Sequence, residues 1–243
     1  MKELSTDIPK EPKRENVHKM FDRIANRYDL LNRLLSFRQD VAWRNKVVSL
    51  LPKKENLSVL DLATGTGDLL LSMAEKSDNL TNGVGLDMSS GMLKYAVIKA
   101  KEQKSPKKLS FIRGDAVHIP FADHSFDVVS IAFGIRNVVD VQESLNEMNR
   151  VLDKNGKALI LEFSLPQNKI VKVGYLFYFR YILPIVGGLI SGDSYAYTYL
   201  NKTVETFPYG KDFCDLMEKA GFTTVSEHRL TFGIATIYEG VKN

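Results

Sequence analysis

The chain has 243 residues, of which 44% are hydrophobic and 26% charged, so it is long enough for one full core of ordinary globular composition. Its formal net charge of +4 is interleaved with acids along the chain, which disfavours a basic nucleic-acid-binding tail. A single cysteine, Cys214, excludes an intramolecular disulfide, and the scattered histidines predict no metal site.

Two segments bear on location. Residues 1–15 contain no apolar run of the kind that a signal peptide needs. The most apolar stretch, residues 174–190, approaches spanning length but carries Arg180, Pro184 and glycines, which argues against a transmembrane helix. We therefore expect a cytoplasmic protein, with peripheral contact to the inner membrane face as an open alternative.

Hydrophobic spacing divides the chain into helices and strands. Hydrophobic residues at helical spacing predict helices over residues 17–31 and 43–51, and Pro52 ends this N-terminal helical region. Five strand-like runs follow at 58–63, 83–87, 109–113, 128–133 and 157–163, separated by segments of helix length. The fourth of those segments is a helix whose apolar stripe begins at Val141, and Gly156 is expected to mark its end.

The last third of the chain departs from this alternation. Residues 166–208 are rich in aromatic side chains and are interpreted as a lid-like insertion. A helix capped by Gly221 then precedes two strands, 223–230 and 234–241, joined through Gly233. The pattern predicts one doubly wound, mostly parallel α/β domain over residues 1–243, with residues 1–52 as a helical cover and a β-hairpin at the sheet edge.

Three strand ends carry the signal for a nucleoside-containing cofactor. The first strand runs into Ala63-Thr64-Gly65-Thr66-Gly67-Asp68, a glycine-rich turn before a helix. Asp87 ends the second strand about 20 residues later, where a carboxylate accepts hydrogen bonds from ribose hydroxyls. Asp115 follows the third strand, where it is placed to accept from an adenine amine.

The cofactor is more consistent with S-adenosylmethionine than with NAD. The NAD fingerprint requires a small residue three positions after the second glycine, and Leu70 occupies that position. Asp61 before the glycines and Asp68 after them suit a cationic cofactor better than a pyrophosphate, because like charges repel.

Several motifs resemble the ubiquinone/menaquinone biosynthesis C-methyltransferases over residues 17–243. The most specific is the run Phe133-Gly134-Ile135-Arg136-Asn137. The others are Met20-Phe21-Asp22-Arg23-Ile24-Ala25 with Tyr28-Asp29, Leu35-Ser36 with Trp43-Arg44, residues 61–68, Gly114-Asp115-Ala116 with Pro120-Phe121, Glu162-Phe163-Ser164, residues 197–207 and residues 230–235.

The resemblance implies C-methylation of a polyprenylated quinol with S-adenosylmethionine, and 2-demethylmenaquinol is the substrate that we expect. With the strand ends, it places cofactor binding at Asp61, Thr64, Gly65, Thr66, Gly67, Asp87, Met88, Asp115, Ala116 and Ala132. In two places the chain departs from the family: Ala132 stands where some members have a cofactor-contacting serine, and Arg38 stands where many have glycine.

Three residues are candidates for the chemistry. Arg136 and Asn137 follow the fourth strand, where α/β sheets place ligands, and a guanidinium there is suited to stabilise a developing oxyanion. Arg136 is not expected to act as a base, because a neutral guanidine is very costly. Tyr28 is placed to hydrogen-bond the quinol oxygen, although it also suits simple packing.

Other functions stay open from sequence alone. A methyltransferase of the same fold acting on another small acceptor, such as a phenol oxygen or a sterol, is the nearest. A noncatalytic cofactor- or lipid-binding subunit of a quinone-synthesis assembly and a nicotinamide oxidoreductase are more distant. Neither the choice of a naphthoquinol or benzoquinol ring nor that of a monomer or homodimer follows from the residues.

Overall fold

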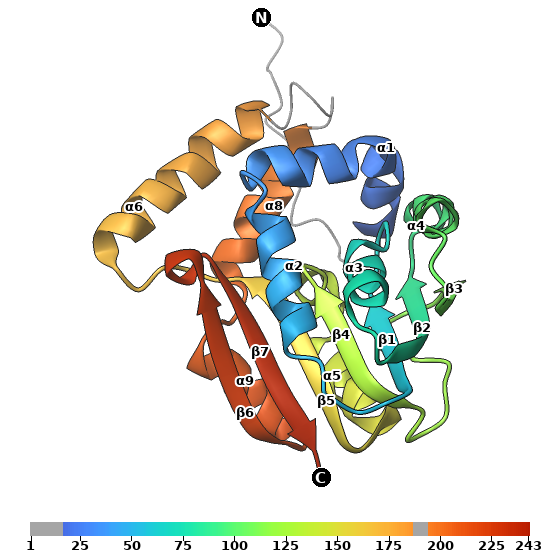
Figure 1. The fold of residues 1–243 in the computed structure, drawn as a ribbon. Helices are drawn as coiled ribbons and strands as arrows, with labels where there is room; N and C mark the ends of the chain where they lie inside the picture. The colour runs from blue at the N-terminus through green and yellow to red at the C-terminus, as the bar shows by residue number, and fades with distance from the viewer. Residues whose placement is uncertain (1–16, 187–193) are drawn as a thin grey trace, which may run out of the picture.

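A computed structural model describes residues 17–186 and 194–243 and contains a seven-stranded sheet in the order β3-β2-β1-β4-β5-β7-β6 (Figure 1). The strands are β1 (Leu57–Leu62), β2 (Leu80–Asp87), β3 (Lys108–Arg113), β4 (Phe126–Ala132), β5 (Leu152–Phe163), β6 (Phe222–Leu230) and β7 (Ala235–Lys242). β1 to β5 are parallel, and β7 runs antiparallel between β5 and β6. The doubly wound sheet with a terminal hairpin is confirmed. Residues 1–15, and 187–190 of the long apolar stretch, lie outside the described residues.

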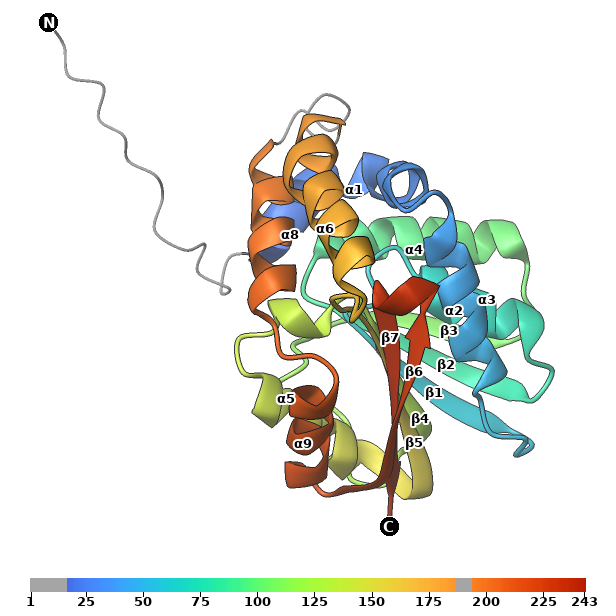
Figure 2. The same cartoon turned by 90° about the vertical axis from the view of Figure 1, so that its left-hand side faces the viewer.

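The strands read as nearly continuous apolar runs because both faces of the sheet are covered. Alternate strand residues contribute to two cores, for example Leu60 to one and Val59 to the other. Helices α5 (Val141–Val151) and α9 (Lys211–Lys219) cover the first core, and α2 (Gln39–Ser49) and α3 (Asp68–Lys76) cover the second. Figure 2 shows these two layers on opposite sides of the sheet, with α4 (Ser90–Gln103) beside α3.

A third apolar layer crosses the carboxyl ends of the strands. It consists of α1 (Val17–Leu35), α6 (Lys169–Phe177), the π-helical turn η3 (Tyr178–Ile182) and α8 (Ser194–Thr206), and it lies above the sheet in Figure 1. Met20 and Ile24 of α1 pack there with Tyr175 and Phe179 of the insertion. Helix α1 and the described part of the insertion, α6, η3 and α8, therefore enclose the edge of the sheet together.

The expected helix end at Gly156 is wrong. Helix α5 ends at Val151, and β5 begins directly at Leu152, so Gly156 lies within the strand. The left-handed residue in this stretch is Asn155, with φ 61°. Glycine is required at 156 for a different reason: a Cβ there would lie 2.8 Å from the Asp153 carbonyl oxygen.

The strand order reverses between β1 and β4, which is where open α/β sheets bind ligands. The turn η2 (Ile135–Asn137) follows β4 at this point, and η4 (Thr231–Gly233) joins β6 to β7. Arg38, before α2, has φ 62°, a left-handed conformation that glycine adopts without strain. Arg38 therefore adopts the left-handed backbone conformation that the glycine of many family members would adopt without strain.

Within residues 17–186 and 194–243, no helix is long and apolar enough to span a bilayer. Among the same residues, no group of three or more histidine, cysteine, aspartate or glutamate side chains is placed to hold a metal ion.

Candidate active site

A cavity of about 260 Å³ lies at the carboxyl ends of β1, β2, β3 and β4. Six of the residues expected to bind the cofactor line it: Gly65, Asp87, Met88, Asp115, Ala116 and Ala132. The other four, Asp61, Thr64, Thr66 and Gly67, lie behind this wall. Predicted cofactor residues therefore divide into those that line the cavity and those that hold its loops.

Asp87 shapes the cavity at the end of β2. Its Oδ2 accepts from the Gly65 backbone N–H (2.8 Å), and its Oδ1 accepts from the Ser89 N–H (2.7 Å). Burial raises the pKa of this carboxyl, against the effect of the two backbone donors. Asp87 thus joins the loops after β1 and β2 while its carboxylate lines the space between them.

Asp61 holds the glycine-rich loop from inside the sheet. Its side chain is buried and accepts from the hydroxyls of Thr64 and Ser130, both at 2.6 Å. Burial, only partly offset by these donors, raises the pKa of Asp61 to about 6. The acid before the glycines therefore orders the loop rather than lining the cavity.

Thr66 and Asp68 tie the same loop to α1 and α4. The Thr66 hydroxyl donates to Asp29 Oδ1 (2.6 Å), and Lys99 pairs with both Asp29 and Asp68. Burial opposes ionisation of Asp68, but nearby Arg44 and Lys99 together lower its pKa. Asp68 is thus matched by protein cations and does not line the 260 Å³ cavity.

The cavity wall suits a ligand that carries positive charge. Among the described residues that line it, two have carboxylates, Asp87 and Asp115, and none is a lysine or arginine. A pyrophosphate would meet repulsion there, whereas an amino group or a sulfonium would meet complementary charge. The residues present therefore fit S-adenosylmethionine.

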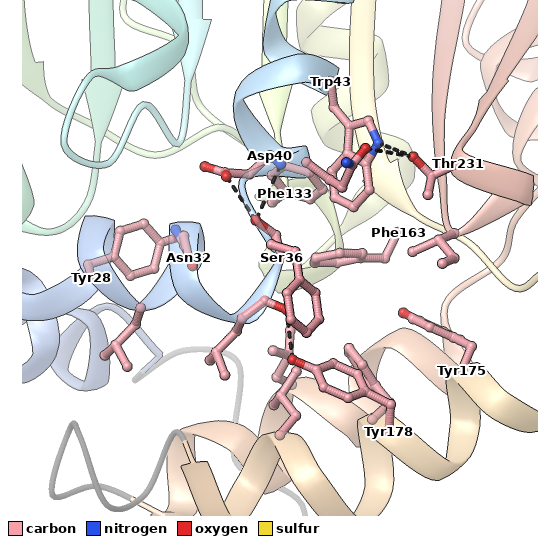
Figure 3. A pocket seen from close by; sticks show the side chains of 18 of the residues that line it. Tyr28, Asn32, Ser36, Asp40, Trp43, Phe133, Phe163, Tyr175, Tyr178 and Thr231 are labelled. Carbon is pink, nitrogen blue, oxygen red and sulfur yellow. Dashed lines mark hydrogen bonds between the residues drawn. The ribbon is translucent and has the colours of Figure 1, made fainter.

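A second, larger cavity of about 430 Å³ lies between the sheet ends and the layer of α1, α6 and α8 (Figure 3). Aromatic and aliphatic side chains dominate its wall, among them Trp43, Phe163 and Phe179. Phe21, Tyr28 and Phe133 line both cavities, so the two spaces adjoin at these residues.

Arg136 lines the larger cavity but is already paired. Its Nη1 donates to Glu162 Oε1 and to the Phe133 carbonyl oxygen, both at 2.6 Å. The guanidinium also lies over the Phe163 ring, 5.4 Å from the centroid, and its buried Nε has no hydrogen-bond partner. Glu162 compensates the positive charge, so a negative charge developing in the cavity meets a neutralised pair.

Tyr28 and Asn137 lie at the boundary between the cavities. Tyr28 contacts Phe21 edge to face, with ring centroids 5.9 Å apart, and burial raises the pKa of its phenol. Asn137 lines the smaller cavity, and its Oδ1 accepts from the Tyr199 hydroxyl (3.1 Å). Tyr28 is therefore a hydrogen-bond donor at neutral pH, and Asn137 links η2 to α8.

Sequence reasoning did not single out three charged residues of this site. Asp40 and Arg44 line the larger cavity from α2, and Glu162 lies beneath it at the end of β5. A signal for the first two was present: an acid and a base four residues apart on one helix form a pair. Arg44 and Glu162 belonged to quoted motifs, but only the fold places Glu162 beside Arg136.

Gly134 sets the spacing between the loops after β1 and β4. A Cβ at this position would lie 2.5 Å from the Ala63 Cβ. We expect Gly134→Ala to lower the free energy of unfolding by about 1–3 kcal/mol, measured by thermal denaturation. Gly174→Ala is the matched control, because a Cβ on Gly174 meets nothing within 4 Å. Equal melting temperatures for both variants would contradict the prediction.

Comparison with known proteins shows which family the sequence matches. The ubiE/COQ5 methyltransferase family matches residues 9–242. The ubiquinone/menaquinone biosynthesis C-methyltransferase UbiE of Geotalea uraniireducens is 45% identical over 230 residues, covering 95% of this chain and 97% of that protein. The demethylmenaquinone methyltransferase of Thermus thermophilus is 44% identical over 221 residues, covering 91% and 99%.

Solved structures show the same fold at low identity. A SAM-dependent methyltransferase from Thermotoga maritima superposes with a TM-score of 0.65 at 19% identity, covering 93% of this chain and 99% of that one. The [4+2]-cyclase SpnF superposes with a TM-score of 0.63 at 15% identity, covering 97% and 98%. Because a cyclase shares the fold, the fold alone does not define the reaction.

Proposed function

The chain belongs to the ubiE/COQ5 methyltransferase family, and we propose that it methylates a ring carbon of a polyprenylated quinol, using S-adenosylmethionine as the methyl donor. The expected substrate is 2-demethylmenaquinol, and the products are menaquinol and S-adenosylhomocysteine. One observation carries this proposal: a cavity lined by carboxylates adjoins a larger apolar cavity at Tyr28, Phe21 and Phe133.

The smaller cavity holds the methyl donor in this proposal. Asp87 accepts from the ribose hydroxyls and Asp115 from the adenine amine, while Gly65 allows the backbone to approach the ligand closely. Asp61 and Thr66 maintain the loop from behind. Bound there, S-adenosylmethionine supplies an electrophilic methyl group.

The larger cavity holds the quinol ring and the first part of its tail. Its apolar wall excludes water, and holding the ring carbon beside the methyl group removes much of the entropic cost of a bimolecular step. Tyr28 donates a hydrogen bond to a ring oxygen, and the Arg136–Glu162 pair fixes the polar end of the cavity. The described elements of the insertion, α6, η3 and α8, act as a lid over this space.

Location of the transferred label tests the proposal. Purified protein is incubated with methyl-labelled S-adenosylmethionine and, separately, with reduced demethylmenaquinone or a reduced demethylated ubiquinone precursor. Label on a ring carbon, found by mass spectrometry, is the expected result, with the naphthoquinol as the better substrate. Label on oxygen would indicate another acceptor class. Cofactor binding without transfer to either quinol would overturn the quinol assignment.

We also propose that the mouth of the larger cavity contacts a lipid bilayer. Phe37 and Phe232 are 75% and 81% exposed, both on turns with positive φ, and Phe37 lines the larger cavity. The exposed side chains of Ile170, Val173 and Phe177 follow helical spacing along α6. Helix α6 contains lysines and no acid, which suits anionic headgroups.

Vesicle flotation tests this contact. Phe37→Ser/Phe232→Ser is expected to reduce binding to phosphatidylglycerol-containing vesicles at least tenfold, because each aromatic side chain contributes about 1.5–3 kcal/mol when buried. Ile98→Ser, an exposed position on α4, serves as control. Unchanged flotation of the double variant, or self-association in place of vesicle binding, would exclude a bilayer as the partner of this face.

A further inference from the structure

The proposed reaction requires an acceptor for a quinol hydroxyl proton, because the ring carbon becomes a stronger nucleophile as its neighbouring oxygen approaches phenolate. Among the described residues that line the larger cavity, Asp40 alone has a carboxylate. We propose that Asp40 is the catalytic residue that accepts this proton. The inference rests on the proposed function and adds a role to a residue outside the motifs for cofactor binding.

The Asp40 carboxylate is held in a fixed orientation. The side chain is only 3% exposed, Ser36 Oγ donates to its Oδ1 (2.8 Å), and Arg44 Nη1 donates to its Oδ2 (2.6 Å). Each carboxylate oxygen has two lone pairs, so these side-chain donors leave acceptor capacity on both oxygens. Figure 3 shows Asp40 above Ser36, with dashed lines that mark the hydrogen bonds between the two residues.

Arg44 connects Asp40 to the boundary between the two cavities. Its guanidinium lies 5.7 Å from the centroid of the Phe133 ring, and Phe133 lines both cavities. The same Nη1 is 3.9 Å from Asp68 Oδ2, so the arginine has a second carboxylate nearby. Arg44 therefore links the proposed proton acceptor to Phe133, which lines both cavities.

Other groups of the cavity suit proton acceptance less well. Burial raises the pKa of Tyr28, Tyr175 and Tyr178, so these phenols remain protonated at neutral pH. Arginine side chains remain protonated in proteins. Glu162 does not line the cavity. Among the described residues of the wall, Asp40 alone has a carboxylate, and its two oxygens keep acceptor capacity.

The proton and electron balance is simple. The hydroxyl proton passes to Asp40 as the ring carbon forms its bond to the methyl group and the sulfur–methyl bond breaks. The methylated ring carbon then loses its own hydrogen as a proton to water, and the proton on Asp40 returns to the ring oxygen as aromaticity is restored. One proton is released per turnover, which matches the conversion of a sulfonium to a thioether.

Asp40→Asn and Asp40→His test the role. Asparagine still accepts from Arg44, and general-base catalysis typically contributes 10²–10⁴-fold, so we expect kcat to fall about 100-fold or more. Histidine restores a titratable acceptor. It is expected to recover at least tenfold over asparagine, with the acid limb of the pH profile moved toward about 6.5, the ordinary imidazole pKa.

Binding measurements separate this role from folding. Affinity for S-adenosylmethionine is measured by calorimetry. Naphthoquinone binding is followed by quenching of Trp43, the one tryptophan of the chain, which lines the larger cavity. Both affinities are expected to stay within about threefold in the Asp40 variants. Asparagine with near-parental turnover, or a histidine variant as inactive as asparagine with binding intact, would overturn the role.

A smaller substitution tests the same role in case the Asp40 variants do not fold. Ser36→Ala removes a donor that orients the Asp40 carboxylate, so kcat is expected to fall about tenfold while both binding affinities stay within about threefold. Ser49→Ala, an exposed serine at the end of α2, the helix that carries Asp40, is the control. Turnover of Ser36→Ala equal to that of Ser49→Ala would overturn the proposal. If the unaltered protein transfers no label to a quinol, the proposed function itself fails instead.

Discussion

Replacing Asp87 by alanine is expected to weaken S-adenosylmethionine binding by about 10- to 150-fold. Hydrogen bonds to a charged group contribute about 1.5–3 kcal/mol, and the proposed ribose contacts depend on this carboxylate. The variant also loses the acceptors for the N–H groups of Gly65 and Ser89, which loosens two loops of the cavity wall. Isothermal titration calorimetry measures the change directly.

Two further variants define the cause of that loss. Asp87→Asn keeps one acceptor oxygen without the charge and should give an intermediate affinity. Asp123→Ala removes an exposed carboxylate that lines neither cavity and should bind the ligand normally. An alanine variant at position 87 with affinity within threefold of the parent would show that the ligand does not use this carboxylate.

The fold could be predicted because its main signals are local in sequence. Parallel strands covered on both sides appear as short apolar runs, and all seven were placed within a few residues of their bounds. The largest error, at the start of β5, has a specific cause. A glycine read as a helix end is required instead by the close approach of the Asp153 carbonyl oxygen to Gly156.

The site was predictable only where position along a strand determines it. Asp87, Asp115 and Asn137 follow strand ends, so the topology brings them to one edge of the sheet, and they line the smaller cavity. Hydrogen bonds between side chains far apart in the sequence could not be predicted. Asp29 meets Thr66 across 37 residues, and no periodicity in the sequence relates the two.

The same distinction applies to charge. Sequence reasoning associated Asp68 with a cationic cofactor, but in the folded chain Arg33 and Lys99 pair with it. Likewise, Arg136 was expected to present its charge to the substrate, and Glu162 compensates it. The sequence identifies which residues carry charge, whereas the fold determines which charges face the ligand.

Glu162→Ala is expected to destabilise the protein by about 3–5 kcal/mol. The pair that it breaks is buried, with side chains 6% and 1% exposed, and removal of one partner leaves the Arg136 charge without compensation. For a chain of this size, each kcal/mol corresponds to about 2–4 °C in melting temperature, so a fall of about 6–20 °C is expected in thermal denaturation.

A double variant separates stability from chemistry at this pair. Arg136→Met/Glu162→Leu replaces both charges by apolar side chains, and such replacements are often neutral for stability, so the melting temperature should return close to that of the parent. Methyl transfer should not return, because the polar end of the cavity is lost. If transfer recovers together with the melting temperature, Arg136 and Glu162 act only in folding, and polar contacts to the quinol must come from Tyr28 and Asp40.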